Sequence, residues 1–88
     1  MTTKFVAILM GSESDLETMN HCADTLSSLN ISYEINILSA HRSPQMTKDY
    51  IADATNRGAQ VFIAAAGLAA HLAGAVAAHT IRPVIGVP

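Results

Sequence analysis

The sequence predicts an α/β domain with a parallel sheet and helices on both faces. Apolar runs of strand length alternate with amphipathic segments of helix length, in the order β-α-β-α-β-α-β. The connections between these segments are short, as in right-handed crossovers between parallel strands. Because 88 residues suit one domain, we expect residues 1–88 to form a single α/β domain.

Four segments predict the strands. Phe5–Met10 is a continuous apolar run, typical of a strand that is covered on both faces. Tyr33–Leu38 alternates apolar and polar residues, and Gln60–Ala65 is the third strand. The last strand, Val84–Val87, is followed by no helix, so we expect it and one face of the sheet to lack cover. The chain is then either the N-terminal half of a longer domain or a domain that neighbouring subunits cover.

Three segments predict the helices. The first runs from about Asp15 to Leu29 after a capping box of Ser14 and Glu17, and Asn30 ends it. The second begins at Ser43-Pro44, which suit an N-cap and a first turn, and ends at Gly58; its apolar stripe is expected to be Met46, Tyr50 and Ala54. An alanine-rich helix spans roughly Ala69–His79.

Composition excludes several function classes. The net charge is −2 and there is no basic block, which disfavours nucleic acid as the main partner. No apolar run approaches the roughly 20 residues of a membrane span, and no secretory signal is apparent. Cys22 is the only cysteine, so no intrachain disulfide can form, and we expect a cytoplasmic protein. Histidines and this cysteine show no metal-ligand spacing, so no metal site is expected.

The most informative segment, Ser39–Ser43, follows the second predicted strand and precedes a helix. It places His41 and Arg42 at the carboxyl end of that strand, where open α/β sheets bind their ligands. A histidine transfers protons near neutral pH, and an arginine holds a phosphate or carboxylate. The pattern therefore predicts proton transfer on an anionic substrate.

Two other loops should emerge at the same edge of the sheet. Gly11–Ser14 joins a glycine and two hydroxyls to a helix N-terminus, which suits an anion, although it is neither a P-loop nor a G-x-G-x-x-G loop. Ser12 has no structural role if the helix begins at Asp15, whereas Ser14 is explained as an N-cap. Asp15 could bind a ligand or satisfy the helix dipole. The loop 66–71 has small side chains that let a flat ligand approach, and its His71 could contact substrate or lie in the core.

Four motifs in order also resemble a known family over residues 5–88. They are Met10–Asp15, Ser39–Arg42, Ala66–Leu72 and Pro83–Pro88. Together they are similar to class I N5-carboxyaminoimidazole ribonucleotide mutase, the catalytic subunit of the phosphoribosylaminoimidazole carboxylase step of purine (IMP) biosynthesis. The resemblance implies a flavodoxin-like three-layer α/β/α fold, here truncated after the fourth strand, and a homo-oligomer, octameric in the family, with sites at subunit junctions.

The resemblance also implies a reaction and its residues. The ribonucleotide N5-carboxyaminoimidazole ribonucleotide would be converted to 4-carboxy-5-aminoimidazole ribonucleotide without a cofactor, metal, ATP or biotin. His41 would be the proton shuttle, and Ser12, Asp15 and Arg42 would bind the substrate. The further substrate-binding residues of these motifs are Ser14, Ser39, Ala40, Gly67 and His71.

Other functions remain open at this point. Leu68 and Ala73 stand where the family usually has glycine and proline, and family members are about twice as long. A truncated module that binds ribonucleotide or oligomerises without turnover is therefore an alternative. A carboxylase that uses CO₂ directly is another, and bicarbonate dependence would separate it from a mutase. A receiver-type signalling domain would need acidic residues where the chain has Met10, Gly11 and Ser12.

Overall fold

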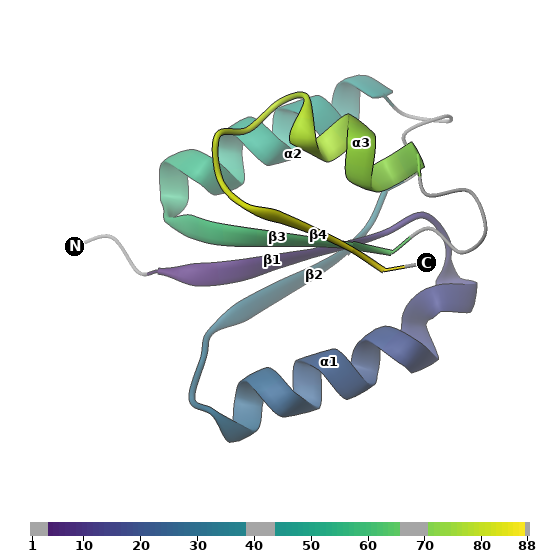
Figure 1. Ribbon diagram of the computed structural model, residues 1–88, viewed down its shortest axis with the longest axis vertical. Coiled ribbons are helices and arrows are strands. Elements are labelled where there is room, and N and C mark those ends of the chain that lie inside the picture. Colours follow the sequence, from purple (N-terminus) through teal and green to yellow (C-terminus); the bar gives the residue numbers. More distant parts are fainter. Residues whose placement is uncertain (1–3, 39–43, 66–70, 88) are drawn as a thin grey trace.

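A computed structural model describes residues 4–38, 44–65 and 71–87, the last range without the side chain of His71. It contains a four-stranded, all-parallel sheet in the order β2-β1-β3-β4. Helix α1 lies on one face of the sheet, and α2 and α3 lie on the other (Figure 1). The predicted parallel sheet with helices on both faces is confirmed. The strands are β1 (Phe5–Met10), β2 (Tyr33–Ile37), β3 (Ala59–Ala65) and β4 (Val84–Val87), and the helices are α1 (Leu16–Ser28), α2 (Pro44–Arg57) and α3 (His71–Ala77).

Alternation along β1 divides the core into two parts. Ala7 and Leu9 are buried toward α2 and α3, in a cluster centred on Phe62. Ile8 and Met10 are buried on the opposite face, against Met19 of α1. A strand with both faces buried needs an unbroken apolar run, which is what predicted β1.

The helix ends follow the expected chemistry. At the end of α1, Asn30 adopts a positive φ of 58°. The Ile31 N–H then donates to the Leu26 carbonyl at 2.9 Å and the Asn30 N–H to the Ser27 carbonyl at 3.0 Å, the pattern of a Schellman motif. Gly58 ends α2 with a φ of 121°, a conformation that favours glycine. Both predicted helix ends are confirmed.

The predicted apolar stripe of α2 is partly wrong. Met46 is 61% exposed, and the buried residues of the helix are Thr47, Ile51 and Ala54. The buried stripe begins at Thr47, one residue after the predicted start, because Met46 in the first turn points away from the sheet. At the start of α1, Leu16 is also 36% exposed.

An ion-pair cluster holds the edge strand β2 against α2. The Arg57 guanidinium donates through Nη1 and Nη2 to the two carboxylate oxygens of Glu34, and through Nε to Asp53 Oδ2 at 2.7 Å. The Tyr50 hydroxyl donates to Glu34 Oε1 at 3.0 Å. The guanidinium also lies over the Phe5 ring, 5.2 Å from its centroid. The cluster therefore connects α2 to both β2 and the start of β1.

This cluster predicts a pH dependence of stability. The hydrogen bond from Arg57 holds the pKa of Glu34 below its ordinary value of 4.5. A carboxyl whose pKa is lower in the folded state stabilises the fold above its unfolded pKa, and this contribution is lost as pH falls through the folded pKa. We expect Glu34→Gln to lower the free energy of unfolding more at pH 7 than at pH 3. Urea unfolding at both pH values tests this, with Glu17→Gln on the exposed side of α1 as the control; equal losses at both pH values would contradict it.

Helix α3 packs closely on β4 because residue 86 is a glycine. A Cβ added to Gly86 would lie 3.1 Å from the Cβ of Ala73, whereas one added to Gly74, exposed on α3, would have no atom within 4 Å. We expect Gly86→Ala to destabilise the domain by about 1 kcal/mol through overpacking. Gly74→Ala should stabilise it by about 0.5–1 kcal/mol, since alanine favours a helix. Urea denaturation measures the change in the free energy of unfolding for both variants. Changes of the same sign would contradict this packing.

Within the described residues, no helix is long and apolar enough to cross a membrane. The expectation that β4 lacks cover on one face is confirmed for the described part of the chain. Ile85 is 53% exposed, although its neighbour Val84 packs into the core under α3.

Candidate active site

The carboxyl ends of β1, β2 and β3 lie side by side at one edge of the sheet. Met10 is in register with Ile37 on one side and with Ala65 on the other. The Leu38 N–H donates to the Met10 carbonyl at 2.8 Å, and the Gly11 N–H donates to the Ala65 carbonyl at 3.0 Å. The three predicted loops therefore begin from adjacent, hydrogen-bonded positions.

The structure describes only the first of these loops. Ser39, Ala40, His41, Arg42 and Gly67 lie outside the described residues, as does the side chain of His71. The backbone of His71 begins α3. The roles expected for these residues remain predictions, although the strand ends that lead into their segments are brought together.

The first loop departs from the expected capping arrangement. Ser12 is the N-cap of a short 3₁₀ helix, η1 (Glu13–Asp15), and its hydroxyl accepts a hydrogen bond from the Ser14 N–H at 3.2 Å. The Ser12 carbonyl accepts from the Asp15 N–H at 3.2 Å. The predictions of a Ser14–Glu17 capping box and of a Ser12 without structural role are wrong, because the tight 3₁₀ turn intervenes before α1 begins at Leu16.

The hydroxyls of Ser12 and Ser14 form a hydrogen-bonded pair on the surface. Their Oγ atoms lie 2.5 Å apart, and either can be the donor. Each hydroxyl has one proton to donate, so whichever donates within the pair leaves the other O–H group to face a ligand. Both residues are exposed. The pair can thus offer one hydroxyl donor to an anionic or carbonyl oxygen.

The Asp15 side chain does not cap α1. It precedes α1, but its carboxylate makes no capping hydrogen bond to the helix, and the residue is partly buried. Glu13, which motif reasoning did not single out, adds an exposed carboxylate to the same turn; its place between the two serines was the available signal. Two carboxylates attract hydroxyl or ammonium groups and repel a phosphate, so a positive charge for a phosphate must come from another segment.

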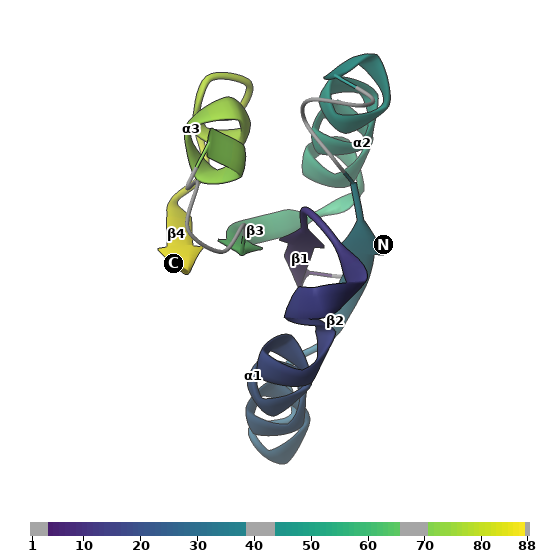
Figure 2. The ribbon, with the colours of Figure 1, turned by 90° about the vertical axis from the view of Figure 1, so that its right-hand side faces the viewer.

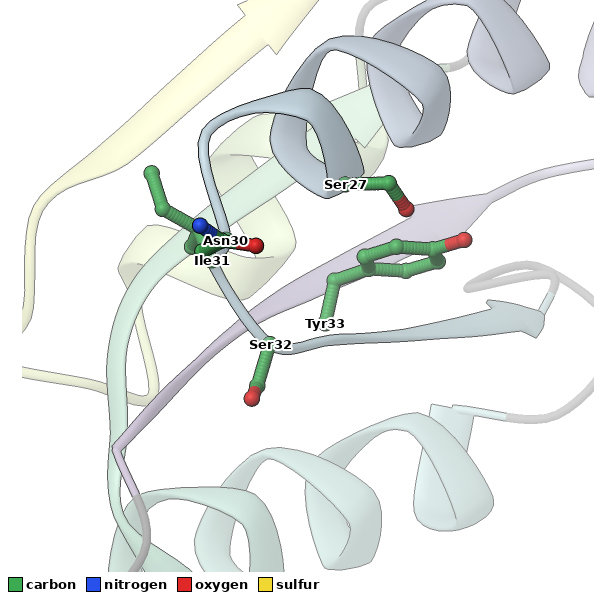
Figure 3. Close-up of a pocket in the computed structure, with 5 residues that line it drawn as sticks. All are labelled: Ser27, Asn30, Ile31, Ser32 and Tyr33. Atoms are coloured by element: carbon green, nitrogen blue, oxygen red, sulfur yellow. The ribbon is translucent and has the colours of Figure 1, made fainter.

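A surface pocket of about 450 Å³ lies far from this edge. Figure 3 shows its lining residues, Ser27, Asn30, Ile31, Ser32 and Tyr33. Tyr33 begins β2, so the pocket is at the amino ends of the strands, opposite the loops described above. Its lining includes no charged side chain, which makes it unsuited to an anionic substrate.

Comparison with known proteins decides the family. The family model described as AIR carboxylase matches residues 5–88. The chain belongs to the AIR carboxylase family. Its match extends from the start of β1 to the end of the chain and thus includes all four motifs noted in the sequence.

Relatives within the AIR carboxylase family are similar over nearly the whole chain. N5-carboxyaminoimidazole ribonucleotide mutase of Vibrio cholerae is 52% identical over 83 residues, which are 94% of this chain and 52% of that protein. The mutase of Bacillus subtilis is 54% identical, over 94% of this chain and 51% of that protein. The crystal structure of Treponema denticola PurE superimposes with a TM-score of 0.86 at 30% identity, over 94% of this chain and 53% of that chain. The chain spans about half the length of these relatives.

Likeness to the solved family structure confirms the flavodoxin-like α/β fold expected from the motifs. In the strand order β2-β1-β3-β4, β1 lies between β2 and β3, and the carboxyl ends of these three strands lie at one edge of the sheet. Sequence and fold together therefore establish the family.

Proposed function

We propose that this chain provides the ribonucleotide site and proton shuttle of an N5-carboxyaminoimidazole ribonucleotide mutase, an isomerase of purine biosynthesis. The observation that supports it best is the 51–54% identity over 83 residues to several proteins that bear this name. The geometry of the strand ends is consistent with it, since the loops containing the expected residues start from adjacent positions.

The reaction explains the residue types. Protonation of the carbamate nitrogen by His41 breaks the N–CO₂ bond and releases CO₂ and aminoimidazole ribonucleotide. The electron-rich C4 of the imidazole then attacks the retained CO₂, and the neutral imidazole of His41 removes the C4 proton and regenerates the aromatic ring. The proton that His41 donates is thus regained, which allows one histidine to act first as acid and then as base.

The loops after β1 and β2 would bind different parts of the substrate. Arg42 would pair with the phosphate or a carboxylate of the substrate, because the first loop supplies only carboxylates and hydroxyls. The Asp15 carboxylate is suited to accept hydrogen bonds from ribose hydroxyls, and the Ser12–Ser14 pair to donate one to an oxygen of the ligand. Ser39, Ala40, Gly67 and His71 would complete the site. A homo-oligomer with sites at subunit junctions and a cytoplasmic location are parts of the same proposal.

A second candidate is a module that binds ribonucleotide without turnover. It is favoured by one observation, that the chain spans about half the length of its relatives. In this case the hydroxyls and Asp15 would hold the ligand, but residues elsewhere in a full-length relative would be needed for the chemistry.

The experiment that separates these functions is an ultraviolet assay of the interconversion of the two carboxylated ribonucleotides by the 88-residue chain, with calorimetry for binding. Interconversion supports the mutase. Binding without interconversion supports the module, and product formation from aminoimidazole ribonucleotide that rises with bicarbonate indicates a direct carboxylase. A folded chain that neither binds nor converts the ribonucleotides would contradict the proposed function.

A further inference from the structure

The strand β2 forms one edge of the sheet. It is the first strand in the order β2-β1-β3-β4, and Figure 2 shows α1 and α2 on the two faces beside it, with no described strand or helix beyond its outer edge. Natural proteins commonly block such an edge with lysine, proline or a bulge, because its unpaired N–H and C=O groups can pair with another strand. β2, with the sequence Tyr-Glu-Ile-Asn-Ile, contains none of these. Its outer edge is therefore open to a further strand.

The hydrogen bonds to β1 show which main-chain groups of β2 point outward. The Val6 N–H donates to the Ser32 carbonyl at 2.9 Å, and the Leu38 N–H donates to the Met10 carbonyl at 2.8 Å. Main-chain groups alternate in direction along a strand, so the even-numbered residues between these two bonds also face β1. The outward N–H and C=O groups are then those of Tyr33, Ile35 and Ile37.

These outward groups are arranged symmetrically about Ile35. When a second copy of β2 runs antiparallel with the two Ile35 residues opposite each other, Tyr33 of each copy lies opposite Ile37 of the other. In each of these residue pairs both N–H···O bonds can form. A twofold axis between the two Ile35 residues uses all the outward groups of both strands and closes the assembly as a dimer.

The side chains on the α1 face fit the same register. Tyr33 and Ile35 pack against the core beneath the sheet, whereas Ile37 is 44% exposed. The second copy would place its Tyr33 ring beside Ile37, which is a favourable cross-strand pair of an aromatic and a β-branched residue. The exposed aliphatic side chain at the end of β2 is thereby covered.

The side chains on the α2 face are also compatible. The register places Glu34 of one copy opposite Asn36 of the other. Glu34 is the only charged residue of β2, so no like charges meet across the pair. Its carboxylate accepts hydrogen bonds from Arg57 and Tyr50 within the chain, and its oxygens retain lone pairs for the Asn36 amide of the other copy.

The helices leave room for this pairing. Because α1 lies beneath β1 and β2 (Figure 2), the two copies of α1 would lie about two strand spacings apart, roughly 9–10 Å. This separation is that of packed helices. The contact would therefore extend from the paired strands to the helices beneath them.

We propose that two copies of this chain associate through β2, antiparallel and centred on Ile35, to form one continuous sheet across a twofold axis. The proposed function names no surface for its homo-oligomer, and this interface uses none of the expected site residues. Because the contact is smaller than a standard interface, we expect a weak dimer with a dissociation constant of about 10–100 µM.

Substitutions of Asn36 test the register through effects of opposite sign. Asn36→Lys places an ammonium group opposite Glu34 of the other copy, and it should tighten the dimer at least about threefold. Asn36→Glu places two carboxylates opposite each other and should weaken the dimer by a similar factor. Sedimentation equilibrium of the 88-residue chain measures both dissociation constants, with a reductant present because Cys22 is free.

The matched controls are Ile81→Lys and Ile81→Glu, which change the net charge by the same amounts. Ile81 is 94% exposed in the segment between α3 and β4, at the other side of the sheet from β2. Both controls should dimerise as the parent does, which separates a local pairing from the general effect of net charge. Circular dichroism establishes that each variant is folded.

Amide hydrogen exchange followed by NMR identifies the edge that pairs. A rise in protein concentration should slow exchange of the outward N–H groups of Tyr33, Ile35 and Ile37. Exchange at Glu34 and Asn36 should change little, because these N–H groups already face β1 within one copy.

Three outcomes would overturn the proposal. They are a folded chain that stays monomeric up to about 1 mM, changes of the same sign for Asn36→Lys and Asn36→Glu, and slowed exchange in β4 instead of β2. A dimer with the expected exchange pattern that does not convert the ribonucleotides would support this proposal and count against the mutase alone, so the two can fail separately.

Discussion

Replacement of Phe62 by alanine is expected to lower the free energy of unfolding by about 3–5 kcal/mol. Phe62 is fully buried in β3, in register with Ala7 of β1 and Val84 of β4, on the face covered by α2 and α3. Native domains are stable by only about 5–15 kcal/mol, so this loss would leave a substantial unfolded population.

The composition of this core explains why the loss of stability should lie near the upper end of the range of about 3–5 kcal/mol. Four of the residues that share the cluster with Phe62 are alanines: Ala7, Ala54, Ala59 and Ala64. Alanine has no rotamer with which to fill a neighbouring void, so the cavity left by the ring would collapse little, and the cost rises with the residual cavity. Urea unfolding followed by circular dichroism measures it.

The control for this substitution is Ile85→Ala in the adjacent strand. Ile85 is 53% exposed, so its truncation removes little buried surface and should cost no more than about 1 kcal/mol. If Phe62→Ala cost as little as Ile85→Ala, the core would not lie where the structure places it.

The strands and helix ends were predictable because each has a local physical cause. An unbroken apolar run marks a strand buried on both faces, as in β1, and a residue that tolerates positive φ marks a helix end, as at Asn30 and Gly58. The parallel order follows because a predicted helix separates each pair of consecutive strands. These strands are therefore joined by crossovers and not by hairpins.

The errors arose where two local arrangements compete. Ser14 followed by Glu17 matches a capping box, but the same residues permit a 3₁₀ turn capped by Ser12, and sequence alone does not rank the two. In α2, periodicity does not distinguish Met46 from Thr47 as the first buried position, because tertiary contacts set the rotation of the helix on the sheet. Of the site, sequence predicted which strand ends meet, since that depends on topology. The hydroxyl pair of Ser12 and Ser14 depends on the turn and was not foreseen.

Replacement of His41 by asparagine is expected to lower the rate of interconversion of the two ribonucleotides by about 10²–10⁴-fold. Asparagine keeps a hydrogen-bonding side chain of similar size but does not exchange a proton near neutral pH. Substrate binding should change little, because the proposal assigns it to Arg42, Asp15 and the serines. The ultraviolet assay and calorimetry of the 88-residue chain measure the two effects.

The pH profile distinguishes a proton shuttle from a residue that merely shapes the loop. The imidazole must start protonated to release CO₂ and becomes neutral by donating that proton, so the rate of this direction should fall as pH rises through the ordinary histidine pKa of about 6.5. Residual activity of His41→Asn should lose this fall, whereas His21→Asn, at an exposed position of α1, should keep both rate and profile. A His41→Asn variant with an unchanged pH profile would assign the proton transfers to another group. Since Leu38, three residues before His41, is hydrogen-bonded to the end of β1 beside Gly11 and Ser12, that group would be sought first along this same edge of the sheet.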